Sequence, residues 1–157
     1  MDKRPNITAN DVKEGSCKRR TLVRLCPDEQ KTRRRVDKFY DDLEKAKSQC
    51  KSQEVKIIQG DFNAKVGKGR RDDIIGEYGL GERNERGDRL FEGAKMNEMI
   101  IGNTWFEHHP RRLWTWLSND DETRNQIDYI LIDKRFRNGM INIKHCQELT
   151  VTVITTY

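Results

Sequence analysis

Hydrophobic and polar positions along this chain fall into two kinds of pattern, one typical of amphipathic helices and one of short strands. Apolar residues recur at helical spacing over 36–46 and again over about 85–99. Short apolar or β-branched runs predict strands, at 54–60, 100–101, 111–118, 126–132 and 149–154. Residues 111–132 then form a β-hairpin and 135–139 a turn or helical corner. The stretch 64–86, rich in glycine and charge, is predicted to be a long loop that is either functional or disordered.

The first 35 residues have a different pattern from the rest. Apolar residues are sparse there and follow no helical or strand period, and two basic clusters stand at 18–20 (KRR) and 31–35 (KTRRR). We therefore predict a basic, poorly ordered arm over 1–35 and one folded domain over 36–157. The arm is open to two interpretations: a nuclear-import or phosphate-binding segment, or a solvated charged tail.

Composition restricts the class of protein and of partner. The chain has 157 residues, the length of one domain, with 34% hydrophobic and 36% charged residues and a formal net charge of +5. This charge favours a polyanionic partner such as nucleic acid, although many basic domains bind none. No apolar run approaches the roughly 20 residues that cross a membrane, and no secretory signal is recognisable at the start. The four cysteines match no zinc pattern. Because no secretory signal is recognisable, we expect an intracellular protein, nuclear or cytoplasmic, with reduced thiols.

The segment 60–67 (GDFNAKVG) carries the strongest chemical signal. It follows the apolar run of the strand at 54–60, so alternation along an extended chain places Asp61 and Asn63 on one face and turns Phe62 toward the core. A carboxylate and a carboxamide together suit a hard cation and a phosphate, because the carboxylate can bind Mg²⁺ or take a proton from water. The alternative is an Asx-rich turn that ends a strand.

Basic and aromatic residues of the predicted hairpin form a second candidate site. The residues that we expect to bind nucleic acid are Arg111, Arg112, Trp114, Arg124 and Asn125. Tryptophan rings can stack on bases, but Trp114 and Trp116 would point to the same side of a strand, so core packing stays open as an alternative. For each arginine the alternative is solvated loop charge.

Three ordered motifs resemble the endonuclease/exonuclease/phosphatase family, and within it the abasic-site nucleases and the endonuclease domains of non-LTR retrotransposons. The motifs are 60–64 (GDFNA), 113–116 (LWTW) and 124–131 (RNQIDYIL), and 79–87 (GLGERNERG) adds a likeness to the retrotransposon branch. The resemblance spans roughly 36–145. It implies an α/β fold: an incomplete two-sheet α/β sandwich, with a mixed sheet and flanking helices.

The same resemblance implies a Mg²⁺-dependent phosphodiesterase that acts on DNA. Asp61 would bind the metal and activate or position the attacking water, and Asn63 would hold the phosphate or the leaving oxygen. Asp128 would orient a catalytic histidine from a neighbouring strand. Without the resemblance, Asp128 reads as an exposed carboxylate at the end of a strand, although it shares a strand face with Ile130 and Ile132.

The chain also departs from the family pattern. The sequence offers no recognisable Glu metal ligand in a strand before 36, and the Ser-Asp-His element is missing, since His145 is the only histidine after Asp128. Residues that act as a unit fail together. We therefore expect a retrotransposon-derived endonuclease fragment that is weak or inactive as this chain. The alternatives are a non-catalytic nucleic-acid-binding relic and an unselected gene fragment.

Overall fold

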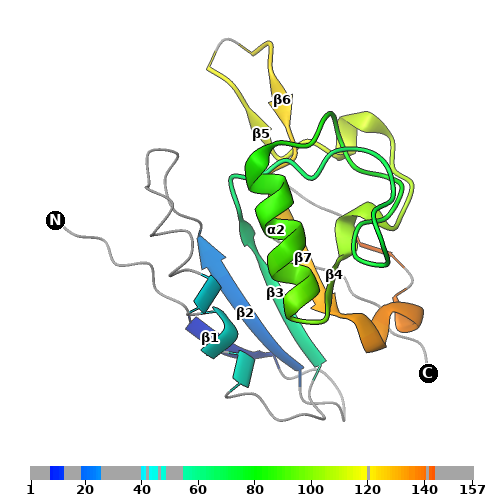
Figure 1. Cartoon of the computed structure of the whole chain (residues 1–157). Helices are drawn as coiled ribbons and strands as arrows, with labels where there is room; N and C mark the ends of the chain where they lie inside the picture. The colour runs from blue at the N-terminus through cyan, green and yellow to red at the C-terminus, as the bar shows by residue number, and fades with distance from the viewer. Residues whose placement is uncertain are drawn as a thin grey trace, which may run out of the picture.

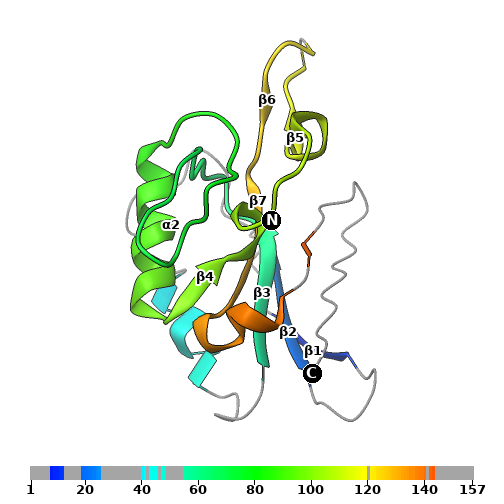
Figure 2. The ribbon, with the colours of Figure 1, turned by 90° about the vertical axis from the view of Figure 1, so that its right-hand side faces the viewer.

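Strands from widely separated parts of the chain build one mixed sheet. The computed structural model describes residues 8–12, 19–25, 40–41, 43–45, 47–48, 55–119, 121–140 and 142–143. Among them a five-stranded sheet has the order β1-β2-β3-β7-β4, and a two-stranded hairpin, β5-β6, projects from one end (Figures 1 and 2). The strands are β1 (Thr8–Val12), β2 (Arg19–Leu25), β3 (Val55–Asp61), β4 (Met99–Ile101), β5 (Trp116–Leu117), β6 (Arg124–Asn125) and β7 (Asp128–Asp133). The helical elements are α2 (Glu85–Met96) and the 3-10 helices η1 (Gly102–Thr104), η2 (Pro110–Arg112) and η3 (Lys134–Gly139).

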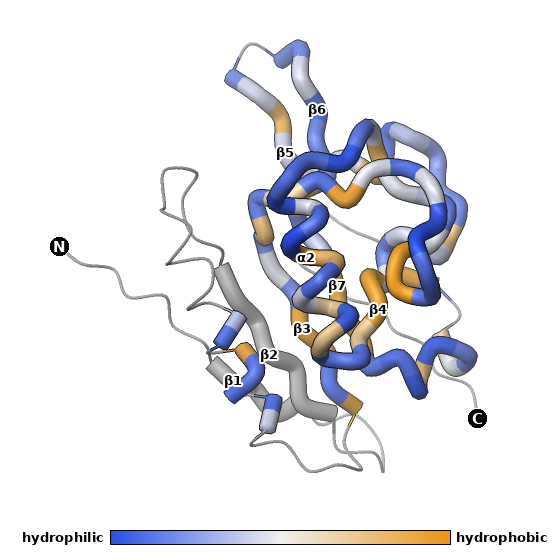
Figure 3. The backbone as a smooth tube through the Cα atoms, viewed as in Figure 1, coloured by the Kyte–Doolittle hydropathy of each residue, from blue (hydrophilic) through white to orange (hydrophobic). Residues whose placement is uncertain are grey.

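The central strands β3, β7 and β4 are apolar on both faces, as strands covered on both sides must be. One face packs with α2 in a cluster that includes Ile58, Leu90 and Leu131. The other face forms a second cluster that includes Ile57 and Ile132. The hydropathy colouring shows apolar stretches along these three strands (Figure 3). The pairing is mixed, because β2 runs parallel to β3 whereas β7 is antiparallel to both β3 and β4.

The helix α2 has clear start and stop signals. The Asn84 side chain accepts a hydrogen bond from the Gly87 N–H, which satisfies a free donor of the first turn. Acidic residues lie in the first turn and Lys95 in the last, so the charges complement the helix dipole. The predicted helix at 85–99 is confirmed over 85–96; residues 97–98 form a turn, and Met99 begins β4.

The long loop 64–86 is ordered, and close backbone contacts require glycine at several of its positions, among them Gly79. The Asn84 side chain also accepts from the Lys65 N–H, which ties the start of the loop to the start of α2. A Cβ atom on Gly79 would lie 1.8 Å from the Gly67 carbonyl oxygen, so the backbone at Gly79 is in direct contact with the backbone at Gly67. The glycines of the 79–87 motif therefore have a structural explanation.

Some expectations from the sequence were wrong. Residues 8–12 and 19–25 are strands, although a poorly ordered arm was predicted over 1–35; β2 is positioned by its pairing with β3, and no local apolar period is needed for that. The predicted domain boundary at 35/36 lies outside the described residues. The strand predicted at 111–118 is also shorter, because Pro110 begins a 3-10 helix, and only Trp116–Leu117 pairs with Arg124–Asn125.

The hairpin predicted over 111–132 was wrong in its second strand, because β5 pairs with β6, and the strand predicted at 126–132 is β7 of the main sheet, paired with β3 and β4. The other local predictions were confirmed where they can be checked. The strand at 54–60 is β3, the apolar pair at 100–101 belongs to β4, and the corner at 135–139 is η3. Within the predicted helix of 36–46, residues 40–41 and 43–45 are helical and Leu43 is buried in the core under α2. The predicted strand at 149–154 lies outside the described residues. None of the described helices has the length and apolar character needed to cross a membrane.

Candidate active site and nucleic-acid cleft

Two of the predicted site residues lie side by side where β3 and β7 meet. Asp61 is the last residue of β3 and Asp128 the first of β7, and the two are direct partners in the antiparallel register. Directly opposed residues of an antiparallel pair point to the same face. Alternation places that face on the side of Ile57 and Ile132, away from α2. Both carboxylates are half-buried.

Asn63 is adjacent to this pair, but not for the reason that the sequence suggested. Extended alternation over 61–63 was wrong, because β3 ends at Asp61 and Asn63 has a left-handed backbone, with φ of 46°. The Asn63 N–H donates to the Asp61 carboxylate over 2.7 Å, an Asx-type turn. Phe62 is buried in the α2-side core, as predicted. The turn therefore holds the carboxamide-bearing residue beside the carboxylate.

Two residues that the sequence analysis did not single out fix the backbone at Asp128. The Asn103 side chain donates to the Asp128 carbonyl and accepts from the Ile130 N–H over 2.7 Å, so it continues the edge of β4 along β7. The Thr115 hydroxyl accepts from the N–H groups of Ile127 and Asp128, at 3.0 and 3.1 Å. Thr115 stands within the 113–116 motif, but no sequence signal marked Asn103, because both contacts depend on tertiary structure.

Tyr129 connects the same end of β7 to the long loop. Its hydroxyl donates to the Gln126 carbonyl over 2.7 Å and accepts from the Val66 N–H over 3.2 Å. Burial raises the pKa of the Tyr129 hydroxyl above its ordinary value, so the hydroxyl stays protonated and keeps its donor role.

The oxygen chemistry at this end of the sheet fits a hard cation, although the number of carboxylates is low. Asp61 and Asp128 supply two carboxylates, and Mg²⁺ is commonly held by one or two carboxylates together with water and substrate phosphate. Gln59 lies two residues before Asp61 on the same strand face and is buried, and its Oε1 accepts no hydrogen bond from the described residues. No group of three or more His, Cys, Asp or Glu side chains suited to a metal occurs in the described part of the chain.

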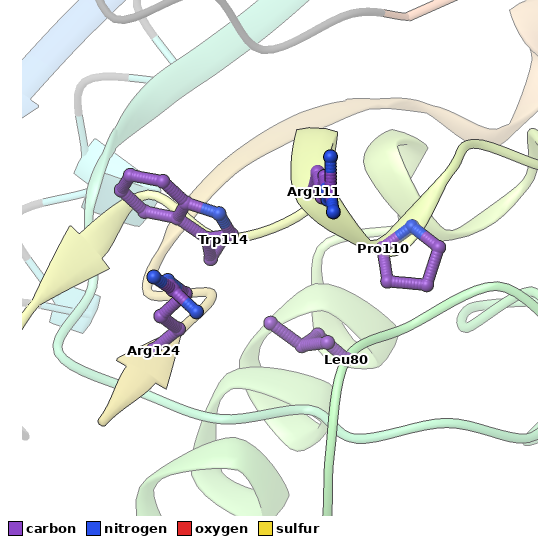
Figure 4. A pocket seen from close by; sticks show the side chains of 5 residues that line it. All are labelled: Leu80, Pro110, Arg111, Trp114 and Arg124. Carbon is purple, nitrogen blue, oxygen red and sulfur yellow. The ribbon is translucent and has the colours of Figure 1, made fainter. Parts of the chain in front are cut away.

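The predicted nucleic-acid-binding residues gather separately, at the base of the β5-β6 hairpin. A cleft of about 460 Å³ there is lined by Arg111, Trp114, Arg124, Leu80 and Pro110 (Figure 4). The Arg124 guanidinium lies 5.7 Å from the centre of the Trp114 ring, a cation–π distance. The two tryptophans do not pack in the core, because Trp114 is half-buried in this cleft and Trp116 is exposed.

The other polar candidates lie around this cleft or within the fold. Arg112 and Asn125 follow lining residues directly in the sequence, but they are not among the described lining residues of the cleft. His108 Nε2 is 2.8 Å from the Ile143 carbonyl oxygen, and His109 Nδ1 accepts from the Arg111 N–H at the start of η2. The described contacts therefore give both histidines a role in holding loops.

Comparison with known proteins supports the family resemblance and the fold. The chain is 42% identical over 109 residues to craniofacial development protein 2 of Bos taurus and 41% identical over 109 residues to that of Tragulus javanicus. Each match covers 69% of this chain but only 18% and 19% of the relatives, so the chain spans about a fifth of their length. The chain is therefore similar to craniofacial development protein 2 over about two thirds of its own length. No protein-family model matches the chain.

A solved structure confirms the fold class. The endonuclease domain of TRAS1, a telomere-specific non-LTR retrotransposon, superposes with a TM-score of 0.62 at 11% identity. The match covers 96% of this chain and 60% of the TRAS1 chain. The chain therefore has an incomplete α/β sandwich fold that superposes on part of this domain.

Proposed function

We propose that this chain is a retrotransposon-derived, Mg²⁺-dependent DNA endonuclease domain, and that its 157 residues alone hydrolyse phosphodiesters weakly or not at all. The observation that carries the proposal is the direct pairing of Asp61, the last residue of β3, with Asp128, the first residue of β7. The likeness to the TRAS1 endonuclease domain gives this pair its nuclease context.

Each residue of the pair and its neighbour has a chemical task in this proposal. The Asp61 carboxylate orients a water molecule and accepts its proton, and the Asn63 side-chain amide donates to a phosphate oxygen. The Asp128 carboxylate is the group that would orient a catalytic histidine, which this sequence does not offer in a Ser-Asp-His element. Asp61 and Asp128 would hold Mg²⁺, which when bound neutralises phosphate charge and lowers the pKa of water.

The same residues explain why the activity of this chain alone should be weak. Two carboxylates leave most of the coordination of an ion to water and phosphate, so binding before the substrate arrives is loose. His145 is the only histidine after Asp128, and it does not stand in a Ser-Asp-His element. A site that lacks one member of a cooperating set typically loses most of its rate.

Plasmid nicking tests the proposal directly. We expect slow conversion of supercoiled to open-circular DNA by the purified chain with Mg²⁺, none with EDTA, and none for Asp61→Ala. Glu77→Gln is the matched control, because it removes one exposed carboxylate from the distant loop. Equal nicking by wild type and Asp61→Ala would reject the site, and fast nicking lost in Asp61→Ala would reject only the weak-activity part.

A second candidate function is nucleic-acid binding without hydrolysis. The net charge of +5 and the arginines of the hairpin cleft favour it. It predicts no Mg²⁺-dependent nicking together with binding that weakens steeply as salt rises. An unselected gene fragment would show neither, and a cooperative thermal melt of the purified chain would count against that alternative.

A further inference from the structure

We infer that the cleft at the base of the hairpin is a binding site for one unpaired nucleotide of a nucleic-acid strand. The base would lie against Trp114, Leu80 and Pro110, and the flanking phosphates against Arg111 and Arg124. The inference deepens the proposed function by naming a strand type, but it requires neither Mg²⁺ nor hydrolysis.

The cleft combines apolar walls with two fixed positive charges. Its volume of about 460 Å³ lies in the range of pockets that take a small organic group. Leu80 comes from the 64–86 loop, Pro110 and Arg111 from η2, and Arg124 from β6, so the side chains converge on one space from separate segments (Figure 4). Convergence of this kind gives a cavity, whereas charges along one loop would give only a charged surface.

A nucleotide matches this lining in both parts. Every base has a π-face that stacks on an aromatic ring, and guanidinium groups pair with phosphate oxygens. No acidic side chain is among the described lining residues, so none of them would repel an anion. Arg124 already stacks near the Trp114 ring, and this orients its guanidinium beside the place where a base would lie.

The recessed, apolar part of the cleft selects against a paired base. A base within a duplex has both π-faces covered by its neighbours, so it cannot lie against Trp114 unless it leaves the stack. Leaving the stack costs free energy, which is least when the base is already single-stranded. We therefore expect the chain to prefer single strands or frayed ends over blunt duplex.

The experiment measures binding of a short labelled single-stranded oligonucleotide, and of the matching blunt duplex, by fluorescence anisotropy in EDTA. Trp114→Ala should weaken single-strand binding roughly fivefold to 100-fold, the range for loss of one stacked base. Trp116→Ala is the matched control, because Trp116 is on the same hairpin, exposed, and outside the described lining of the cleft. It should change binding less than twofold (~0.4 kcal/mol).

The arginines give an independent readout through salt. Arg111→Gln and Arg124→Gln should each lower the slope of log affinity against log salt by about 0.7, the value for one phosphate contact on a single strand. Lys95→Gln should leave the slope nearly unchanged, because Lys95 is an exposed cation in the last turn of α2 and is not among the described lining residues of the cleft. Trp114→Phe keeps a stacking ring and should retain most of the affinity, which separates stacking from a folding defect.

Several outcomes would overturn the inference. Equal losses for Trp114→Ala and Trp116→Ala would do so, as would duplex binding as tight as single-strand binding. Displacement by an acidic aromatic peptide but not by a mononucleotide would assign the cleft to a protein partner instead. Because all arms are run without Mg²⁺, a failure of nicking does not affect the result.

Discussion

The carboxylate end of the sheet and the arginine cleft lie close along the chain but are built in different ways. At the carboxylate end, the positions of Asp61 and Asp128 are set by strand register, and the buried side chain of Asn103 holds the adjoining backbone. In the cleft, exposed Arg111 and Arg124 extend from the short elements η2 and β6.

This difference predicts how each region responds to change. A residue that carries backbone hydrogen bonds in the interior costs stability when it is removed, because its partners lose their bonds away from water. A surface arginine costs little stability, and its loss affects binding instead. The carboxylate end should therefore be sensitive in folding experiments, and the cleft only in binding experiments.

Of the substitutions proposed here for stability, Asn103→Ala should lower the free energy of unfolding most. It removes the hydrogen bonds to the Asp128 carbonyl and the Ile130 N–H, and the residue is 4% exposed. We expect a loss of about 1–3 kcal/mol in the free energy of unfolding, measured by urea denaturation. Asn138→Ala, on the exposed side of η3, should change it by less than about 0.5 kcal/mol. Similar losses in both variants would contradict the role of Asn103.

Asp128→Asn should raise the stability of the fold, by less than Asn103→Ala lowers it. Like charges directly opposed on neighbouring strands destabilise a sheet by about 0.2–1 kcal/mol, and Asp61 is the opposed residue. The variant should therefore be more stable than wild type in EDTA, as measured by thermal melting. Excess Mg²⁺ should raise the melting temperature of wild type more than that of the variant. A variant that is less stable in EDTA would show that the carboxylates do not repel.

Asp73→Asn should have the smallest effect, because this carboxylate is solvated. A hydrogen bond from Arg70, together with the charge of Lys134, lowers the pKa of Asp73 below its ordinary value of 3.8. A carboxyl group with a lowered pKa stabilises the fold above the unfolded-state value, and this contribution is lost as the pH falls through the folded-state value. Wild type and variant should therefore differ slightly at neutral pH and converge in acid. High salt should also reduce the difference, and a difference that persists in acid would contradict the assignment.

Local sequence patterns predicted the parts of the fold in which one element buries its own apolar face. The apolar run before Asp61 and the helical spacing of Leu90, Phe91 and Ala94 are signals of that kind, and both elements formed where expected. The motif likeness selected Asp61 and Asp128, and the structure placed them in direct register. Their catalytic roles stay predictions.

The sequence did not predict features that depend on distant partners. β2 is rich in arginine, and its strand conformation follows from pairing with β3 rather than from its own period. Asn103 lies in a 3-10 turn, and nothing in the residues around it indicates that its side chain will bond to β7. Asn63 was assigned to an extended chain because the alternation of the strand was continued past its end, where the backbone instead turns to a positive φ.

The hydrogen bond from the Val66 N–H to the Tyr129 hydroxyl joins residues 63 positions apart. Contacts of such long sequence separation must wait for most of the chain, so proteins rich in them fold slowly. During synthesis, Asp61 emerges well before the strand that will carry its partner. We therefore expect the two carboxylates to come together late in folding. Truncation before β7 would remove both Asp128 and the strand that pairs with β3.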